Sequence, residues 1–255
     1  MAKIIDLSKT IKYYKDDPFY MKVKIEHKPH LKSNFLIKFF LRLPKRLFPR
    51  YFIGWADDTI KKMGVHSTTH IDAPWHYSPY MEDKKAPTID MMPLEYGYGD
   101  GIVIDMTHKK DFEIITKEDV MFKLIENQIK IEPGNIVLIR TGRDRLIGTK
   151  IYPDSGTGMS REATEWIIDQ GVKVMGIDQW GWDLPLKYAV KKAKELNDSE
   201  FFWQGHMLGT EKEYYHMEQL VNLDKLPVSG FKVAVFPLKI EGASAAPARV
   251  VAILE

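Results

Sequence analysis

The chain carries at residues 65–76 the stretch Val65-His66-Ser67-Thr68-Thr69-His70-Ile71-Asp72-Ala73-Pro74-Trp75-His76. Three of the eight histidines of the protein and one aspartate fall within residues 66–76, all at even positions. Imidazole and carboxylate groups gathered this closely are typical of a metal site. The conformation of the stretch therefore decides what it can bind and what kind of fold must surround it.

A regular helix does not bring these four side chains together. It would place His66 and His70 on one face but turn Asp72 about 200° away from His70, and Pro74 disfavours it as well. An extended segment points even positions to one side, yet residues 66–76 fully extended would span about 33 Å, too far for one ion. The stretch must therefore curl, and we expect His66, His70 and Asp72 to bind metal while His76 takes another role.

The absence of cysteine limits the chemistry of such a site. The sequence has no cysteine at all, which excludes disulfides, thiolate nucleophiles and cysteine-ligated zinc. Two imidazoles and one carboxylate leave coordination positions open, as in catalytic metal sites. The ligand set predicts a divalent metal, with Zn²⁺ as the first expectation and Mn²⁺ or Fe²⁺ as alternatives. Attack of metal-activated water on an amide or ester carbonyl is the reaction that these residues favour.

Composition narrows the class of protein further. The 255 residues suffice for one large domain or two small ones, and a hydrophobic content of 44% predicts a packed core. A formal net charge of +2 is too balanced to indicate nucleic-acid binding. No apolar run reaches membrane-spanning length, and the first residues form no signal-peptide core. We expect a cytoplasmic protein with a small-molecule substrate and no membrane span.

Strand-like and helix-like patterns alternate along the chain. Short runs rich in Ile and Val, bounded by Gly, Pro or Asp, predict strands at residues 3–7, 101–106, 135–140, 173–177, 231–236 and 249–254. Amphipathic patterns predict helices at residues 116–128, 160–169 and 188–196, the first two beginning with the capping residues Thr116 and Ser160. The alternation predicts an α/β domain, and we expect one domain over residues 1–255.

One segment differs from the rest of the chain. Residues 28–50 contain seven Lys or Arg and no acidic residue, interleaved with Phe and Leu. We interpret the region at about residues 28–55 as an insertion, a lid or a subunit-contact helix broken at Pro44. The alternative is that residues 28–50 lie on a membrane surface, which would favour a non-catalytic metal-binding or membrane-peripheral protein.

The His66–His76 stretch resembles the signature of a known family, the cyclase-like metal hydrolases. This family includes bacterial kynurenine formamidase, isatin hydrolase and trans-dienelactone hydrolase, and its signature reads His-x-Gly-Thr-His-x-Asp-x-Pro-x-His. The chain reproduces the signature with one departure, because Thr68 replaces the glycine. Further resemblances are Asp6-Leu7-Ser8 near the start of the chain and, near its end, Phe236-Pro237-Leu238-Lys239-Ile240 followed by Gly242, Ser244, Pro247 and Arg249.

The resemblance implies a fold and an activity. The fold is a swivelling β/β/α domain of the cyclase and kynurenine formamidase type, assembled as a homodimer or homotetramer. The activity is hydrolysis of a small carbonyl compound, acting on the C–N bond of a cyclic amide or of an N-formyl amide such as N-formylkynurenine. Hydrolysis of a lactone is the alternative. Trp75, Trp180 and Trp182 could wall a pocket for a planar ring.

The resemblance also implies roles for single residues. His66, His70 and Asp72 would bind a first metal, and His76 would act as general acid and base. His206 and Glu218, twelve residues apart, match the spacing of the distal ligands that complete a second metal bridged by Asp72. Other branches of the family bind one ion and have a glutamine there, so one or two ions per chain remain open, with Gln179 or Gln204 as the glutamine in a one-ion site.

Two other enzyme classes fit the sequence less well. Gly242-Ala243-Ser244 comes near the nucleophile elbow of a serine hydrolase but lacks the final glycine and precedes no helix. Gly97-Tyr98-Gly99 precedes a predicted strand, whereas a dinucleotide-binding glycine loop follows one.

His216 lies two residues before Glu218, so on a strand both side chains would face the same way. A site role and a surface position are both open for His216.

Overall fold

The structure is a computed structural model that describes residues 2–254. The chain divides into two compact units. The larger unit combines the residues up to Thr10 with those from Val65 onward, and the smaller unit is Ile11–Gly64. Each unit is described separately below.

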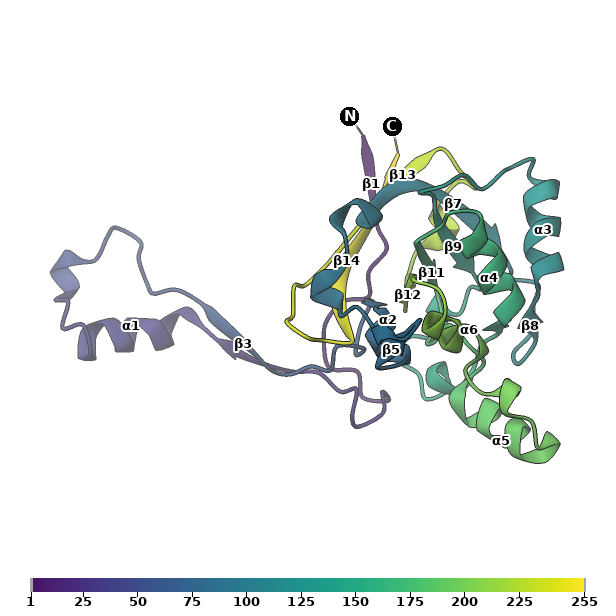
Figure 1. The fold of residues 1–255 in the computed structure, drawn as a ribbon. Helices are drawn as coiled ribbons and strands as arrows, with labels where there is room; N and C mark the ends of the chain where they lie inside the picture. The colour runs from purple at the N-terminus through teal and green to yellow at the C-terminus, as the bar shows by residue number, and fades with distance from the viewer. Residues whose placement is uncertain (1, 255) are drawn as a thin grey trace. The chain divides into compact units, whose positions relative to one another are not determined.

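The larger unit contains most of the regular structure (Figure 1). Its strands are β1 (Lys3–Asp6), β4 (His70–Asp72), β5 (Tyr80–Met81), β6 (Lys84–Lys85), β7 (Tyr98–Asp105), β8 (Ile114–Ile115), β9 (Ile136–Arg140), β10 (Gly158–Met159), β11 (Val174–Ile177), β12 (Tyr215–Glu218), β13 (Phe231–Pro237) and β14 (Ala245–Leu254). Its α-helices are α2 (Pro74–Tyr77), α3 (Lys117–Glu126), α4 (Arg161–Asp169), α5 (Leu186–Leu196) and α6 (Gln204–Met207).

Eight of these strands form one mixed sheet that closes on itself. Their order is β1-β14-β13-β7-β9-β11-β12-β4, and β4 also pairs with β14, which gives a barrel-like arrangement. Strands β7, β9, β11 and β12 run parallel to one another, and β7 and β12 are antiparallel to their outer neighbours β13 and β4. β1 pairs with β14 in antiparallel register, Lys3 opposite Leu254, so the two ends of the chain lie close together (Figure 1).

Alternation along the parallel strands creates two hydrophobic cores. In β9, Ile136 and Leu138 belong to one buried cluster, which the inward-facing residues of the barrel strands build. Val137 and Ile139 belong to the other cluster, together with the apolar faces of α3 and α4. Strands buried on both sides read as continuous apolar runs, which is why the sequence marks them clearly.

The capping residues of two helices behave as the sequence predicts. Thr116 Oγ1 accepts a hydrogen bond from Asp119 N at 3.3 Å, and Thr116 N donates to Asp119 Oδ2 at 2.8 Å. Ser160 Oγ accepts from Ala163 N at 3.0 Å. These contacts satisfy amide groups that the first turn of a helix leaves unpaired.

The α/β prediction is confirmed, and all six predicted strands and three predicted helices have counterparts within a few residues. Within the eight-stranded sheet the prediction missed β4 and β12, which have three and four residues and carry polar side chains on one face. The narrower description as a swivelling β/β/α domain stays a prediction. No helix within residues 2–254 is both long and apolar enough to cross a membrane.

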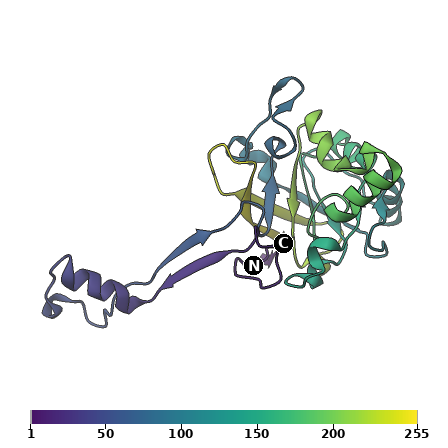
Figure 2. The same ribbon diagram turned by 90° about the horizontal axis from the view of Figure 1, so that it is seen from below.

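The smaller unit contains the basic, apolar segment. The strands β2 (Lys24–Lys28) and β3 (Asp57–Lys62) pair as an antiparallel ribbon. The helix α1 (His30–Phe39) lies between them in the sequence. Figure 2 gives a second view of the ribbon diagram. The helix ends at Phe39, five residues before Pro44, so the prediction of a break at Pro44 was wrong in position. Large side chains on and after α1 are exposed, among them Phe35 and Phe40.

Candidate metal centre

Two short neighbouring strands place four polar side chains on a common face. In the antiparallel pair of β4 and β12, His216 lies opposite Asp72 and Glu218 lies opposite His70. Directly opposed residues point to the same side of a sheet, and the residues between them point to the other side. Ile71 and Met217 accordingly join the core of the barrel. The i, i+2 spacing in both strands therefore builds the site and the core from alternate residues.

The other three histidines come from less regular segments. His66 lies in the turn before β4, His76 on α2 and His206 on α6. Pro74 is the first residue of α2, where its missing amide hydrogen is not needed by the helix. The stretch from 66 to 76 curls as predicted, and no helix runs through it, because the only helical turn in it begins at Pro74. The single turn of α2 returns His76 toward Asp72.

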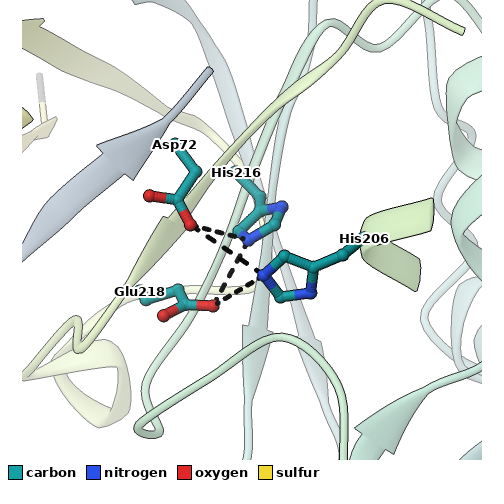
Figure 3. A group of neighbouring side chains, drawn as sticks. All are labelled: Asp72, His206, His216 and Glu218. Atoms are coloured by element: carbon teal, nitrogen blue, oxygen red, sulfur yellow. Dashed lines mark hydrogen bonds and ion pairs between the residues drawn. The ribbon is translucent and has the colours of Figure 1, made fainter. Parts of the chain in front are cut away.

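The Asp72 carboxylate lies between two groups of imidazoles. Its Oδ1 is 2.9 Å from His66 Nδ1 and 3.3 Å from His70 Nε2. Its Oδ2 is 3.4 Å from His216 Nε2 and 4.0 Å from His206 Nε2 (Figure 3). Each carboxylate oxygen thus faces at least two imidazole nitrogens, an arrangement that suits binding of cations.

Glu218 repeats this arrangement from the neighbouring strand. Its Oε2 is 3.5 Å from His70 Nε2, and its Oε1 is 3.3 Å from His216 Nε2 and 3.7 Å from His206 Nε2. Trp182 N donates a hydrogen bond to Oε1 at 2.8 Å, which fixes the carboxylate. Asp72 and Glu218 therefore both present one oxygen to each side of the cluster.

Two of the imidazoles are oriented by an oxygen acceptor at Nδ1. His70 Nδ1 lies 2.7 Å from the carbonyl oxygen of Thr68. His206 Nδ1 contacts the carboxylate of Asp183, which also accepts hydrogen bonds from the amides of Gly205 and His206. An imidazole that donates from Nδ1 keeps its lone pair on Nε2, the form that binds metal. Thr68, which replaces the family's glycine, has no positive φ, so it adopts this backbone without strain.

The residues fit a divalent cation. Asp72 and His70 are fully buried, yet both Asp72 oxygens and His70 Nε2 have no hydrogen-bond partner within the described chain. Burying an uncompensated carboxylate is costly, and buried charges are normally paired or bound to metal. Nitrogen and oxygen donors in this number suit Zn²⁺ or Mn²⁺. The cation would satisfy the three atoms that the protein leaves unsatisfied.

The pKa values show how strongly the carboxylates attract positive charge. Burial alone would raise the pKa of Asp72, but His66, His70 and His76 hold it well below its usual range. Burial would lower the pKa of His216, yet Asp72 and Glu218 raise it to about 9. Burial lowers the pKa of His76 to about 4, and the pull of Asp72 does not compensate. The His76 ring is therefore neutral at pH 7.

The structure brings all six expected site residues into one cluster: His66, His70, Asp72, His76, His206 and Glu218. It adds two residues that the sequence interpretation left out or left open, Asp183 and His216. The i, i+2 spacing of His216 and Glu218 was the one signal available for His216. Trp182 is fully buried and packs on His216, so its expected role as a pocket wall was wrong.

A closed α/β barrel carrying a buried cluster of imidazoles and carboxylates defines the class as a metal-binding α/β protein with an enzyme-like centre. The profile of the putative cyclase family matches residues 5–184, well over half of the chain. The chain belongs to that family.

Similar proteins include two with named activities. The chain is 26% identical over 203 residues to isatin hydrolase of Roseibium aggregatum, covering 75% of this chain and 73% of that protein. It is 24% identical over 189 residues to kynurenine formamidase of Bacillus cereus, covering 74% and 76% respectively. A crystal structure of an isatin hydrolase bound to the product analogue thioisatinate superposes with a TM-score of 0.75 at 20% identity, covering 99% of this chain and 92% of that one. The fold is therefore shared.

The first prediction concerns protonation of His76 in metal-free protein. Its pKa in the fold is about 4 against an ordinary value of 6.5, so the neutral ring stabilises the fold above about pH 6.5 and this contribution declines as the pH falls through 4. The melting temperature of His76→Gln should therefore fall less than that of the unchanged protein between about pH 7 and pH 5. His216 acts in the opposite sense. Its raised pKa stabilises the fold below about pH 6.5, and this contribution is lost as the pH rises through about 9.

Thermal melts followed by circular dichroism in chelator check this prediction, with the exposed His108→Gln as the matched control. An equal fall in melting temperature between about pH 7 and pH 5 for His76→Gln and for the control would contradict it.

The second prediction concerns Asp183, which orients His206 through Nδ1. Asp183→Asn preserves volume but removes the charged acceptor, and loss of such an outer partner typically weakens metal binding about 10–100-fold. Titration with Zn²⁺ against a chromophoric chelator measures this change. Asp169→Asn, the same substitution at a carboxylate paired with Lys212, should bind as tightly as the unchanged protein. Equal affinity in both variants would exclude an orienting role for Asp183.

Proposed function

We propose that this chain is a metal-dependent hydrolase that cleaves the C–N bond of a small amide, either cyclic or N-formyl. Family membership and the buried histidine–carboxylate cluster support the class of enzyme. One observation carries the proposal: both buried oxygens of Asp72 lack hydrogen-bond donors while facing imidazoles on two sides. A structural carboxylate would have donors in those places.

The ligands and the reacting groups divide the work. His66, His70 and Asp72 would hold one ion, and His206 and Glu218 would contribute to a second. A divalent ion bound there would supply activated water at neutral pH and polarise the substrate carbonyl. The protein's own part is to fix the ligand geometry and to move the proton that the leaving nitrogen needs.

His76 is the residue best suited to carry that proton. Its Nε2 lies 3.9 Å from Asp72 Oδ2, and its side chain is 22% exposed. Within residues 2–254 its ring nitrogens make no hydrogen bond, unlike those of the other clustered histidines. A neutral, unanchored imidazole beside the cluster can accept a proton from water and deliver it to a departing amine.

The substrate class follows from the relatives and from one aromatic residue. Isatin hydrolase and kynurenine formamidase are named for amide substrates that carry an aromatic ring, which favours an amide over a lactone. Trp203 stacks on His206 at 4.7 Å between ring centroids and lies 5.6 Å from the ring of His76. Its φ of 57° is a left-handed conformation that a bulky residue adopts only at a cost. This indole is a suitable wall for a planar substrate.

Several narrower features belong to the same proposal. We expect Zn²⁺ before Mn²⁺ because imidazoles supply most of the ligands. We also expect a cytoplasmic enzyme, a homodimer or homotetramer, and one domain over residues 1–255 in which the segment at about 28–55 is an insertion. The exposed aromatic side chains of α1 are compatible with a subunit contact.

One contact favours a second mechanism and must be tested. Ser244 Oγ lies 3.4 Å from His66 Nε2, and His66 Nδ1 lies 2.9 Å from Asp72 Oδ1. Serine, histidine and aspartate in this sequence of contacts are the elements of a serine-hydrolase triad. In the metal-dependent mechanism, Ser244 only fixes the ring of His66.

The third prediction separates these mechanisms. Exhaustive chelation should abolish hydrolysis of a formanilide or an isatin-like lactam, and Zn²⁺ or Mn²⁺ should restore it. Ser244→Ala should keep kcat within about tenfold, whereas loss of a triad nucleophile costs about 10⁶-fold. A chelated protein that remains fully active, together with an inactive Ser244→Ala, would establish the serine mechanism instead.

The fourth prediction separates proton transfer from metal binding. His76→Ala should keep its metal but lose about 10²–10⁴-fold in kcat, the usual contribution of general acid–base catalysis. His70→Ala should lose both metal and activity, because His70 Nε2 faces both carboxylates. Metal analysis and steady-state kinetics on the same preparations measure both quantities. A His76→Ala protein as poor in metal as His70→Ala would make His76 a ligand.

A further inference from the structure

We infer that His216 is a metal ligand, the second imidazole of a position that it forms with His206, Asp72 and Glu218. Tyr77 is the positioning residue that orients it. The inference rests on the metal-dependent function proposed above, but it concerns which residues bind and not which substrate is cleaved.

Strand register gives His216 the same orientation as the expected ligands. His216 is the direct cross-strand partner of Asp72, as Glu218 is of His70. The pleat that turns His70, Asp72 and Glu218 into the cluster therefore turns His216 into it as well. His216 is fully buried, so its ring is not a surface group that happens to lie near the site.

The distances match a four-ligand position. His216 Nε2 lies 3.4 Å from Asp72 Oδ2 and 3.3 Å from Glu218 Oε1. His206 Nε2 lies 4.0 and 3.7 Å from the same two oxygens (Figure 3). Ligand atoms about 2.1 Å from a tetrahedral zinc ion are separated from one another by about 3.4 Å. Two nitrogens and two oxygens are thus close to the spacing that one such ion requires.

Tyr77 supplies the outer partner that a metal-binding histidine needs. Its hydroxyl oxygen lies 3.0 Å from His216 Nδ1. When the Nδ1–H group donates to this oxygen, the lone pair of Nε2 faces both carboxylates. His70 and His206 have the same arrangement, with Thr68 and Asp183 as acceptors. The equivalence of the three rings is the argument for equivalent roles.

Packing holds the His216 ring in this orientation. Tyr77 stacks on one side with ring centroids 5.4 Å apart, and Trp182 stacks at 5.2 Å. Gly209 makes room for Tyr77, because a Cβ at residue 209 would lie 1.9 Å from Tyr77 Cδ2. The glycine therefore allows the phenol to reach His216.

The test is a metal titration of the full chain after chelation, using Zn²⁺ with a chromophoric competitor and Co²⁺ absorption for ligand geometry. The unchanged protein should bind two ions. His216→Gln should bind one, because it removes a ligand nitrogen, and Tyr77→Phe should bind the second ion about 10–100-fold more weakly. The matched controls are His108→Gln, at an exposed histidine, and Tyr215→Phe, whose hydroxyl donates to Glu213.

The inference is overturned if His216→Gln and Tyr77→Phe both bind two ions as tightly as the controls, even when their melting temperatures fall. If the unchanged protein binds a single ion, loss of that ion in His216→Gln supports the inference and its retention overturns it. Should His216→Gln fail to fold, Tyr77→Phe alone decides by the same affinities. Hydrolysis does not enter these outcomes, so an inactive two-ion protein would refute the proposed function and leave the inference standing.

Discussion

Burial of the Asp72 carboxylate is the constraint on which the rest of the centre depends. Its side chain is 1% exposed and lies among five imidazoles within 4.0 Å. Removing a carboxylate from water costs several kcal/mol even after the protein relaxes, and that cost must be offset locally. The imidazoles keep the pKa of Asp72 well below its usual range, so the group stays ionised and attracts a cation. The positions of the neighbouring imidazoles follow from their contacts with this charge.

The same short strand that carries Asp72 also closes the barrel. β4 pairs with β12 on one side and with β14 on the other. Ile71, between His70 and Asp72, is fully buried in the barrel core. Three residues therefore join the sheet, fill the core and supply two site residues. Because distortion of β4 would disturb the fold as well as the centre, the strand gives His70 and Asp72 a rigid support.

The local part of the site could be predicted from sequence, and the distant part could be predicted only through resemblance. His66, His70, Asp72 and His76 lie within one curled stretch, where spacing and chain reach limit the options. Glu218 and His216 lie on a strand of four residues, too short to show a clear period. Only the pairing of β12 with β4, more than 130 residues away, reveals that His216 faces Asp72. Asp183 had no signal at all, because its role depends on contact with His206.

Four of the histidines in the cluster divide into two kinds by how they are anchored. A ligand must keep one tautomer and one orientation, and His70, His206 and His216 each contact an oxygen through Nδ1. A proton carrier must exchange protons and change partners, which a fixed hydrogen bond would hinder. His76 lacks such an anchor within the described chain and has a ring that is neutral at pH 7, since its pKa is about 4. Anchoring, and not distance to Asp72 alone, is therefore the basis on which we propose proton transfer for His76 and metal binding for the anchored rings.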